Sequence, residues 1–176
     1  MPLTLTLENL ILRLSRGLGV LTAVLFVVML ATVFINVIKR YALNDVSIGM
    51  QEMEWHLYAA MFLLGVPYAL SAGGHVRVDL IYEKLSAQRK AWIDIAGTVI
   101  FLIPFCTLVA YFGVQFTQEA YALGETSGDP GGLPYRWIIK SMIPLSFGFT
   151  VISGLGLLLT SVNTLLGHHD HPPLSL

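Results

Sequence analysis

Four long stretches of the chain hold no Asp, Glu, Lys or Arg: residues 17–38, 55–74, 95–118 and 141–166. A helix needs about 20 predominantly apolar residues to cross the hydrocarbon core of a bilayer. Each stretch is long enough to do so. The pattern predicts an all-α membrane protein in which four transmembrane helices form one domain over residues 17–166. With their polar ends, the predicted spans are about 17–38, 55–74, 91–118 and 138–166.

The first 16 residues show a different pattern, because apolar residues recur there at helical spacing between charged ones. The apolar positions are Leu3, Leu7, Leu10, Ile11 and Leu14, and the charged ones are Glu8, Arg13 and Arg16. This spacing predicts a short amphipathic helix in the membrane interface, with a flexible start to the first span as the alternative. A cleaved secretory signal is disfavoured, because the apolar run is too long and lacks an Ala-x-Ala exit.

Composition agrees with a membrane protein. Hydrophobic residues make up 55% of the chain and charged residues only 12%, whereas a soluble domain carries about 25% charged residues. The net charge of −1 gives no reason to expect a nucleic-acid partner. The single cysteine, Cys106, excludes a disulfide within the chain and is interpreted as a small buried hydrophobe.

Lys and Arg counts in the polar segments predict the topology. The N-terminus, the second connection and the C-terminus hold six of these residues, and segments 39–54 and 119–140 hold four. Basic residues concentrate on the cytoplasmic side. Both termini are therefore predicted to be cytoplasmic, with residues 167–176 as a flexible tail. Its His168, His169 and His171 could bind a metal, but a terminal histidine tract is more often disordered.

The sequence also predicts where helices begin, kink and pack closely. Asn44, Asp45 or Ser47 can cap the second helix, and Ser86 the third. Pro67 cannot donate to the carbonyl of Leu63, which predicts a kink, and Pro104 frees one carbonyl in the third span in the same way. Glycines at 148, 154 and 156 are predicted to allow close helix contacts along the fourth span.

The charged junction between the second and third spans begins at Gly73-Gly74 and continues with His75, Arg77 and Asp79. It is either a solvated loop or an enclosed group of charges that holds the two helices together. Asp94 follows shortly afterwards. Its carboxylate could cap the third helix or reach water, or could be a buried partner of Arg77 or Lys90.

The predicted spans hold few residues that could bind an ion or cofactor or catalyse a reaction. Transport pathways are usually marked by ionisable residues inside the membrane, and the four spans have none at their centres. A haem protein would need paired histidines on facing helices, yet only His56 and His75 lie near the membrane. No nucleophile motif, phosphate loop or metal-ligand spacing is present. The sequence predicts a non-enzymatic membrane scaffold without cofactor, metal or catalytic residues.

Several short motifs resemble one family. They are Asn36-x3-Arg40-Tyr41, Glu52-x2-Trp55-His56-Leu57, Phe62-Leu63-Leu64-Gly65, His75-Val76-Arg77-Val78-Asp79, Ala91-Trp92-Ile93-Asp94, Gly131-Gly132-Leu133-Pro134 and Lys140-x3-Pro144-Leu145. Over roughly residues 20–165 they resemble the small membrane subunit of tripartite ATP-independent periplasmic (TRAP) transporters, in the subgroup for keto acids, mannitol or chloroaromatic compounds. Met50 departs from the pattern, because many relatives carry Trp or another bulky aromatic there.

The resemblance implies a complex in the bacterial inner membrane. A periplasmic binding protein would deliver an organic acid, a large membrane subunit would move it with sodium, and the small subunit would brace the large one. The expected subunit junction comprises Arg40, Glu52, Trp55, His75, Arg77, Asp79 and Asp94, and the expected contacts to the binding protein are Lys39, Glu119 and Asp129. Two other hypotheses remain at this point: an anchor or assembly subunit of a redox or signalling complex, and a self-sufficient four-span exporter.

Overall fold

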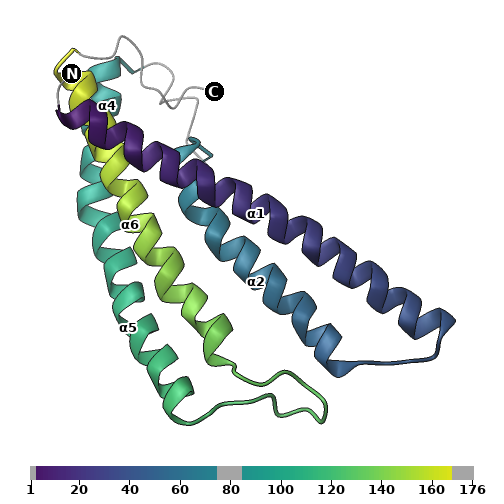
Figure 1. Ribbon diagram of the computed structural model, residues 1–176. Helices are drawn as coiled ribbons and strands as arrows, with labels where there is room; N and C mark the ends of the chain where they lie inside the picture. The colour runs from purple at the N-terminus through teal and green to yellow at the C-terminus, as the bar shows by residue number, and fades with distance from the viewer. Residues whose placement is uncertain (1–2, 75–84, 168–176) are drawn as a thin grey trace.

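The computed structural model describes residues 3–74 and 85–167, and its regular elements are all helical (Figure 1). The elements are α1 (Leu3–Ala42), α2 (Ile48–Ser71), α4 (Ala87–Gly97), a π-helical turn (Thr98–Leu102), α5 (Ile103–Ala122) and α6 (Trp137–Leu165). This confirms the all-α prediction. His75, Arg77 and Asp79 of the expected junction lie outside the described residues.

Three helical stretches in the described part of the chain are long and apolar enough to cross a membrane: Thr4–Ala42, Ala87–Ala122 and Trp137–Leu165. The second of them is continuous through α4, the π turn and α5. Helix α2 is not among them, and its first turns hold Glu52, Glu54 and His56. A fourth crossing by α2 therefore stays a prediction.

The expected separate helix over residues 1–16 is not seen, because α1 runs without interruption from Leu3 to Ala42. No proline falls in this range, and Gly17 and Gly19 lower helix propensity without stopping the helix. At 1.5 Å per residue, α1 is about 60 Å long, roughly twice the 30 Å hydrocarbon core. It must tilt strongly or project beyond the bilayer. An interfacial position for its first turns stays a prediction.

The connections are shorter than the polar segments suggested. Helix α2 begins at Ile48 because Ser47 caps it, with the Ser47 hydroxyl accepting from the Met50 amide at 3.3 Å. Ser86 occupies the cap position before α4 but makes no side-chain cap bond. The loop between α5 and α6 spans residues 123–136.

The helices form two pairs. Helix α1 packs along α2, and α5 packs along α6, while α6 also contacts α2, α1 and α4. Figure 1 shows the pairs close together near the N-terminus of α1 and separating toward the α1–α2 and α5–α6 loops. Helix α6 is thus the central element of the described bundle.

Burial is reversed relative to a soluble protein. The buried side chains include more polar than apolar residues, whereas large apolar side chains such as Phe34, Phe101 and Leu108 are exposed. Buried polar groups on α6 include Ser146, Thr150, Ser153, Thr160, Ser161, Asn163 and Thr164. Small hydroxyl-bearing residues between helices and large apolar residues outside are typical of membrane helix bundles.

Two of the three glycines predicted to permit close contact on α6 do so. A Cβ at Gly156 would lie 2.7 Å from the Ile11 side chain of α1, and one at Gly154 would lie 2.7 Å from the Leu102 side chain. The prediction is wrong for Gly148, where a Cβ would meet nothing within 4 Å. Glycine spacing alone does not reveal which glycines face a neighbouring helix.

The carbonyl freed by Pro67 finds its partner on another helix. The Ser146 hydroxyl of α6 donates to the Leu63 carbonyl of α2 at 2.5 Å. Both Pro67 and Ser146 are almost completely buried. A backbone carbonyl without a partner is costly in an apolar medium, so the proline in α2 makes this helix depend on α6.

At Pro104 the backbone hydrogen bonding adjusts within the same helix, without a partner on another helix. The π-helical turn Thr98–Leu102 directly precedes it, and the Ile103 amide donates to the Thr98 carbonyl, five residues back. A π turn absorbs one extra residue into the helix. The break expected at Pro104 is therefore a change of hydrogen-bond register within one continuous helix.

We expect Ser146→Ala to destabilise the bundle by about 1 kcal/mol, because it leaves the Leu63 carbonyl without a partner. In a Pro67→Ala background, residue 67 regains its amide and can bond Leu63 within α2, so the same substitution should cost much less. Thermal unfolding of the four proteins of this cycle in detergent gives the coupling. Ser141→Ala, where the hydroxyl bonds only its own helix at Ile138, is the matched control. An equal cost of Ser146→Ala in both backgrounds would contradict the explanation.

Candidate functional site

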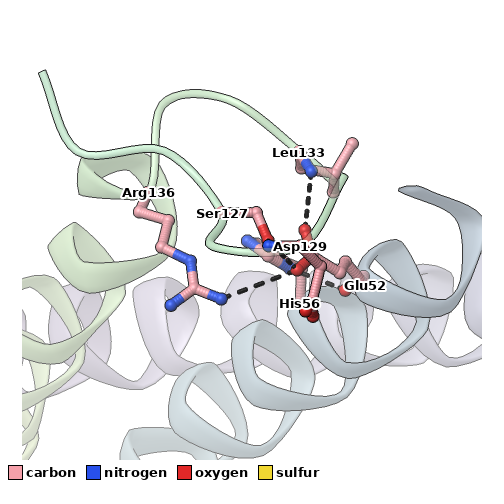
Figure 2. Close-up of polar contacts among 6 residues, drawn as sticks. All are labelled: Glu52, His56, Ser127, Asp129, Leu133 and Arg136. Atoms are coloured by element: carbon pink, nitrogen blue, oxygen red, sulfur yellow. Dashed lines mark hydrogen bonds and ion pairs between the residues drawn. The ribbon is translucent and has the colours of Figure 1, made fainter. Parts of the chain in front are cut away.

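One carboxylate joins the two loop-bearing ends of the bundle. Glu52, in the second turn of α2, accepts from the Ser127 hydroxyl at 2.5 Å and from the Leu133 amide at 2.6 Å. The guanidinium of Arg136 lies 3.6 Å from the same carboxylate. We call Glu52, Ser127, Leu133 and Arg136 the loop clamp (Figure 2). It holds the α5–α6 loop against α2.

The loop also bonds to itself in the shape that the clamp requires. The Ser127 amide donates to the Leu133 carbonyl, and the Asp129 amide donates to the Ser127 hydroxyl, both at 3.1 Å. Gly131 has a φ of +80°, which favours glycine. A Cβ at Gly132 would lie 2.9 Å from the Glu52 carboxylate, so a side chain there would displace it.

The clamp keeps Glu52 charged. Its pKa lies below the ordinary value, chiefly because the Ser127 hydroxyl and then the Leu133 amide donate to the carboxylate, with smaller contributions from the charges of Arg136 and His56. Burial acts in the opposite direction but is outweighed. Hydrogen bonds to the ionised form of an acid favour that form. Glu52 is therefore an anion at neutral pH.

Aromatic rings surround the clamp. The Arg136 guanidinium lies 5.6 Å from the centre of the Trp55 ring, and the Trp55 and His56 rings lie 3.9 Å apart. His56 Nδ1 donates to the Glu52 carbonyl at 2.6 Å, since a carbonyl can only accept. Rings of this kind collect at the membrane–water interface.

The same end of the bundle holds two further contacts from α1. The Asn36 amide group donates to the Glu54 carboxylate at 2.6 Å, and Lys39 pairs with Asp45 at 2.9 Å. Residues two positions apart point away from each other on a helix. Glu52 and Glu54 therefore tie α2 to two different neighbours, the α5–α6 loop and α1.

A second polar cluster lies at the opposite end of α1 and corrects the amphipathic prediction for Glu8. Glu8 is only 3% exposed and accepts from the Thr160 hydroxyl and the Asn163 amide group of α6, each at 2.7 Å. Nearby, Ser15 bonds Ser153 at 3.1 Å and Ser71 at 2.8 Å. The first turns of α1 are packed into the bundle on this face.

The remaining expected site residues are scattered. Arg40 lies in the last turn of α1, and Asp94 is half-buried on α4 beside Ser161 and Thr164. Glu119 and Asp129 are exposed at the loop end. Within the described residues, no three His, Cys, Asp or Glu side chains gather as a metal site would need.

Of the expected junction, the structure brings together Glu52 and Trp55 and adds three partners that sequence reasoning missed: Ser127, Leu133 and Arg136. The family resemblance gives Glu52 as a junction residue but does not indicate its partners. Its partners lie 75 or more residues away in the sequence, so no local pattern reveals them. The one signal was the pair of motifs around Glu52 and around Gly131-Gly132-Leu133-Pro134, which meet here.

Comparisons with known proteins all find similarity to one kind of membrane transport protein. The family model described as "Tripartite ATP-independent periplasmic transporters, DctQ component" matches residues 29–164. The ectoine TRAP transporter small permease protein of Halomonas elongata is 26% identical over 164 residues, which cover 91% of this chain and 78% of that protein. The C4-dicarboxylate TRAP transporter small permease protein of Rhodobacter capsulatus is 27% identical over 122 residues, covering 69% of this chain and 52%, or about half, of that protein.

Removal of the Glu52 carboxylate should release the α5–α6 loop. A spin label on Gly128→Cys, where added atoms meet nothing within 4 Å, reports loop motion in a Cys106→Ala background. We expect Glu52→Ala to narrow the electron paramagnetic resonance lines of the label strongly. Ser127→Ala should narrow them less, since it removes the bonds of its hydroxyl to Glu52 and Asp129 but leaves the Leu133–Glu52 bond in place. Glu119→Ala, an exposed carboxylate at the same end, is the control. A spectrum of Glu52→Ala that matches wild type would show that the loop does not depend on the clamp.

The clamp should resist acid down to the ordinary range of glutamate. Because the pKa of Glu52 is lowered from 4.5, its stabilising effect is complete above that value and disappears as pH falls through the lowered pKa. The label at residue 128 should keep one mobility from pH 7 to about 4.5 and become mobile below it. Glu52→Gln should show a loosened loop at every pH. A wild-type transition well above pH 4.5 would contradict the assigned cause.

Proposed function

The chain belongs to the family of DctQ components, the small permease subunits of tripartite ATP-independent periplasmic transporters, and we propose that it acts as the scaffold of such a complex in the bacterial inner membrane. In this proposal it braces a large membrane subunit, which imports an organic acid with sodium, and contains no ion or substrate site of its own. Its relatives are transporter subunits rather than enzymes, which disfavours the redox and signalling hypothesis.

The relatives themselves support a role that is not specific to substrate. Two small permeases similar to this chain to nearly the same degree serve transporters named for ectoine and for C4-dicarboxylates. If this component selected the substrate, two such different names would be unexpected at similar identity. We therefore assign selection of the acid to the partner subunits.

The observation that carries the scaffold proposal is the state of the buried charges. In the described part of the chain the buried acidic or basic side chains are Glu8 and Glu52. Each lies near a helix end with two donors already bound to it. A sodium–carboxylate site needs converging oxygens for the ion and donors for the acid near mid-membrane. These two carboxylates are instead used to join helices.

The surfaces fit two kinds of partner. Helices α1 and α5 carry most of the exposed large apolar side chains, which offers broad faces to a large membrane subunit and to lipid. The periplasmic binding protein would meet the loop end, where Glu119 and Asp129 are exposed and the clamp fixes the loop. Lys39 is already paired with Asp45, so we expect it to contribute less there than the two acids.

Calorimetry separates a scaffold from a self-sufficient transporter. Titration of sodium together with a panel of organic acids into the purified subunit should give no saturable heat, because its buried carboxylates are occupied by internal donors. The assembled complex with the large subunit is the positive control. Saturable, sodium-dependent binding to this chain alone would refute the scaffold proposal.

Topology can be tested with single cysteines at exposed positions in a Cys106→Ala background. Cysteines at Leu43 in the α1–α2 loop and at Gly128 in the α5–α6 loop should react with an impermeant thiol reagent in whole cells. A cysteine at Gln88, near the start of α4, should react only after the cells are opened. The reverse pattern would place the loop clamp in the cytoplasm and overturn the proposed orientation.

A further inference from the structure

Helix α5 exposes polar side chains in a stretch that is long and apolar enough to cross a membrane. Thr107, Tyr111 and Gln115 recur every four residues and are all exposed, Tyr111 to 62%. Thr107 lies near the centre of the uncharged stretch 95–118, and Gln115 lies about 12 Å further toward the loop end. None of the three side chains makes a hydrogen bond to another described residue. We call these three residues the α5 stripe.

The α5 stripe points away from the rest of the bundle. The buried residues of α5 are Cys106, Gly113 and Ala120, and a Cβ at Gly113 would lie 3.1 Å from Pro144 of α6. Tyr111 and Gly113 are two residues apart, which corresponds to about 200° around a helix. The stripe therefore lies opposite the face that packs on α6, at the edge of the described bundle (Figure 1).

The polar side chains in the apolar part of α1 behave differently. The hydroxyls of Thr22 and Thr32 each donate to the carbonyl four residues back in their own helix. Asn36 is buried and donates to Glu54 of α2. The outer surface of α1 is therefore apolar and suited to lipid, whereas the α5 stripe presents donors and acceptors that this chain does not use.

We propose that the large membrane subunit docks on the α5 stripe, through a transmembrane helix whose polar side chains bond Thr107, Tyr111 and Gln115. Acyl chains have neither donors nor acceptors, so a glutamine amide that faces them loses hydrogen bonds without replacement. A second copy of this chain fits less well. In the same membrane orientation it would bring two exposed Glu119 carboxylates, one turn beyond Gln115, close together, and like charges repel. The inference rests on the proposed scaffold function and adds which helix meets the partner.

Photo-crosslinking in cells that co-express this chain with its large membrane subunit tests the docking face. Benzoylphenylalanine in place of Tyr111 should crosslink to the large subunit, identified by mass spectrometry of the joined peptides. The same residue in place of Phe34 on α1, which is exposed to a similar degree at 66%, should not. A crosslink to the large subunit from position 34 and not from position 111 would overturn the proposal. So would a crosslink from position 111 to a second copy of this chain.

Removal of the polar groups is an independent test, because its sign depends on what covers the stripe. Gln115→Leu should lower the apparent association constant with the large subunit about threefold in detergent, the effect of one interhelical hydrogen bond in a membrane protein. The triple variant Thr107→Val, Tyr111→Phe, Gln115→Leu should lower it at least tenfold. Thr32→Val, where the hydroxyl bonds only its own helix, is the matched control and should leave it unchanged.

This test separates failure of the docking face from failure of the scaffold function. The triple variant alone should unfold at the wild-type temperature, since the stripe makes no hydrogen bond to other described residues. If wild type binds the large subunit and the folded triple variant binds it equally well or better, the α5 stripe faces lipid and the present proposal is wrong. If wild type does not bind the large subunit at all, the scaffold proposal fails and this inference fails with it.

Discussion

The hydrogen bond from Ser146 to the Leu63 carbonyl is the contact on which the arrangement of the bundle depends. Pro67 removes the amide that would normally bind Leu63, and in an apolar surrounding a free carbonyl is costly. The Ser146 hydroxyl of α6 donates a hydrogen bond to this carbonyl in place of the missing amide. The contact fixes how near α2 and α6 approach at mid-height. On one side of it, Ser15 of α1 bonds both Ser71 of α2 and Ser153 of α6. On the other side, the loop clamp joins α2 to the α5–α6 loop.

The interior of this protein is organised by small polar groups rather than by large apolar ones. Hydroxyls of α6 and two buried carboxylates supply directed bonds, while Leu, Ile, Val and Phe lie on the outside, where lipid or another subunit covers them. In a bilayer the hydrophobic effect gives helices no reason to associate, so association rests on close packing and hydrogen bonds. The close approach of Gly156 to Ile11 and the Glu8–Asn163 bond serve that purpose for α1.

Local features were predictable from the sequence, and long-range pairings were not. The helices, the Ser47 cap and the carbonyl freed by Pro67 follow from residue spacing and backbone chemistry. The continuous α1 was missed, since a change from amphipathic to fully apolar patterning looks like a boundary although nothing in Leu3–Ala42 stops a helix. The partners of Glu52 and Glu8 were missed because a carboxylate near a helix end has the same sequence signature whether it faces water or another helix.

The proline in α2 also has a consequence for how the chain enters the membrane. Helices are delivered to the bilayer in chain order, and α6 is the last one. Until it arrives, the Leu63 carbonyl of α2 lacks the Ser146 hydroxyl that binds it in the finished bundle. The backbone hydrogen bonding of α2 is therefore complete only when the final helix has been made. A chain that stops before α6 would leave the Leu63 carbonyl unpaired, so the proline makes a finished α2 conditional on the last helix of the chain.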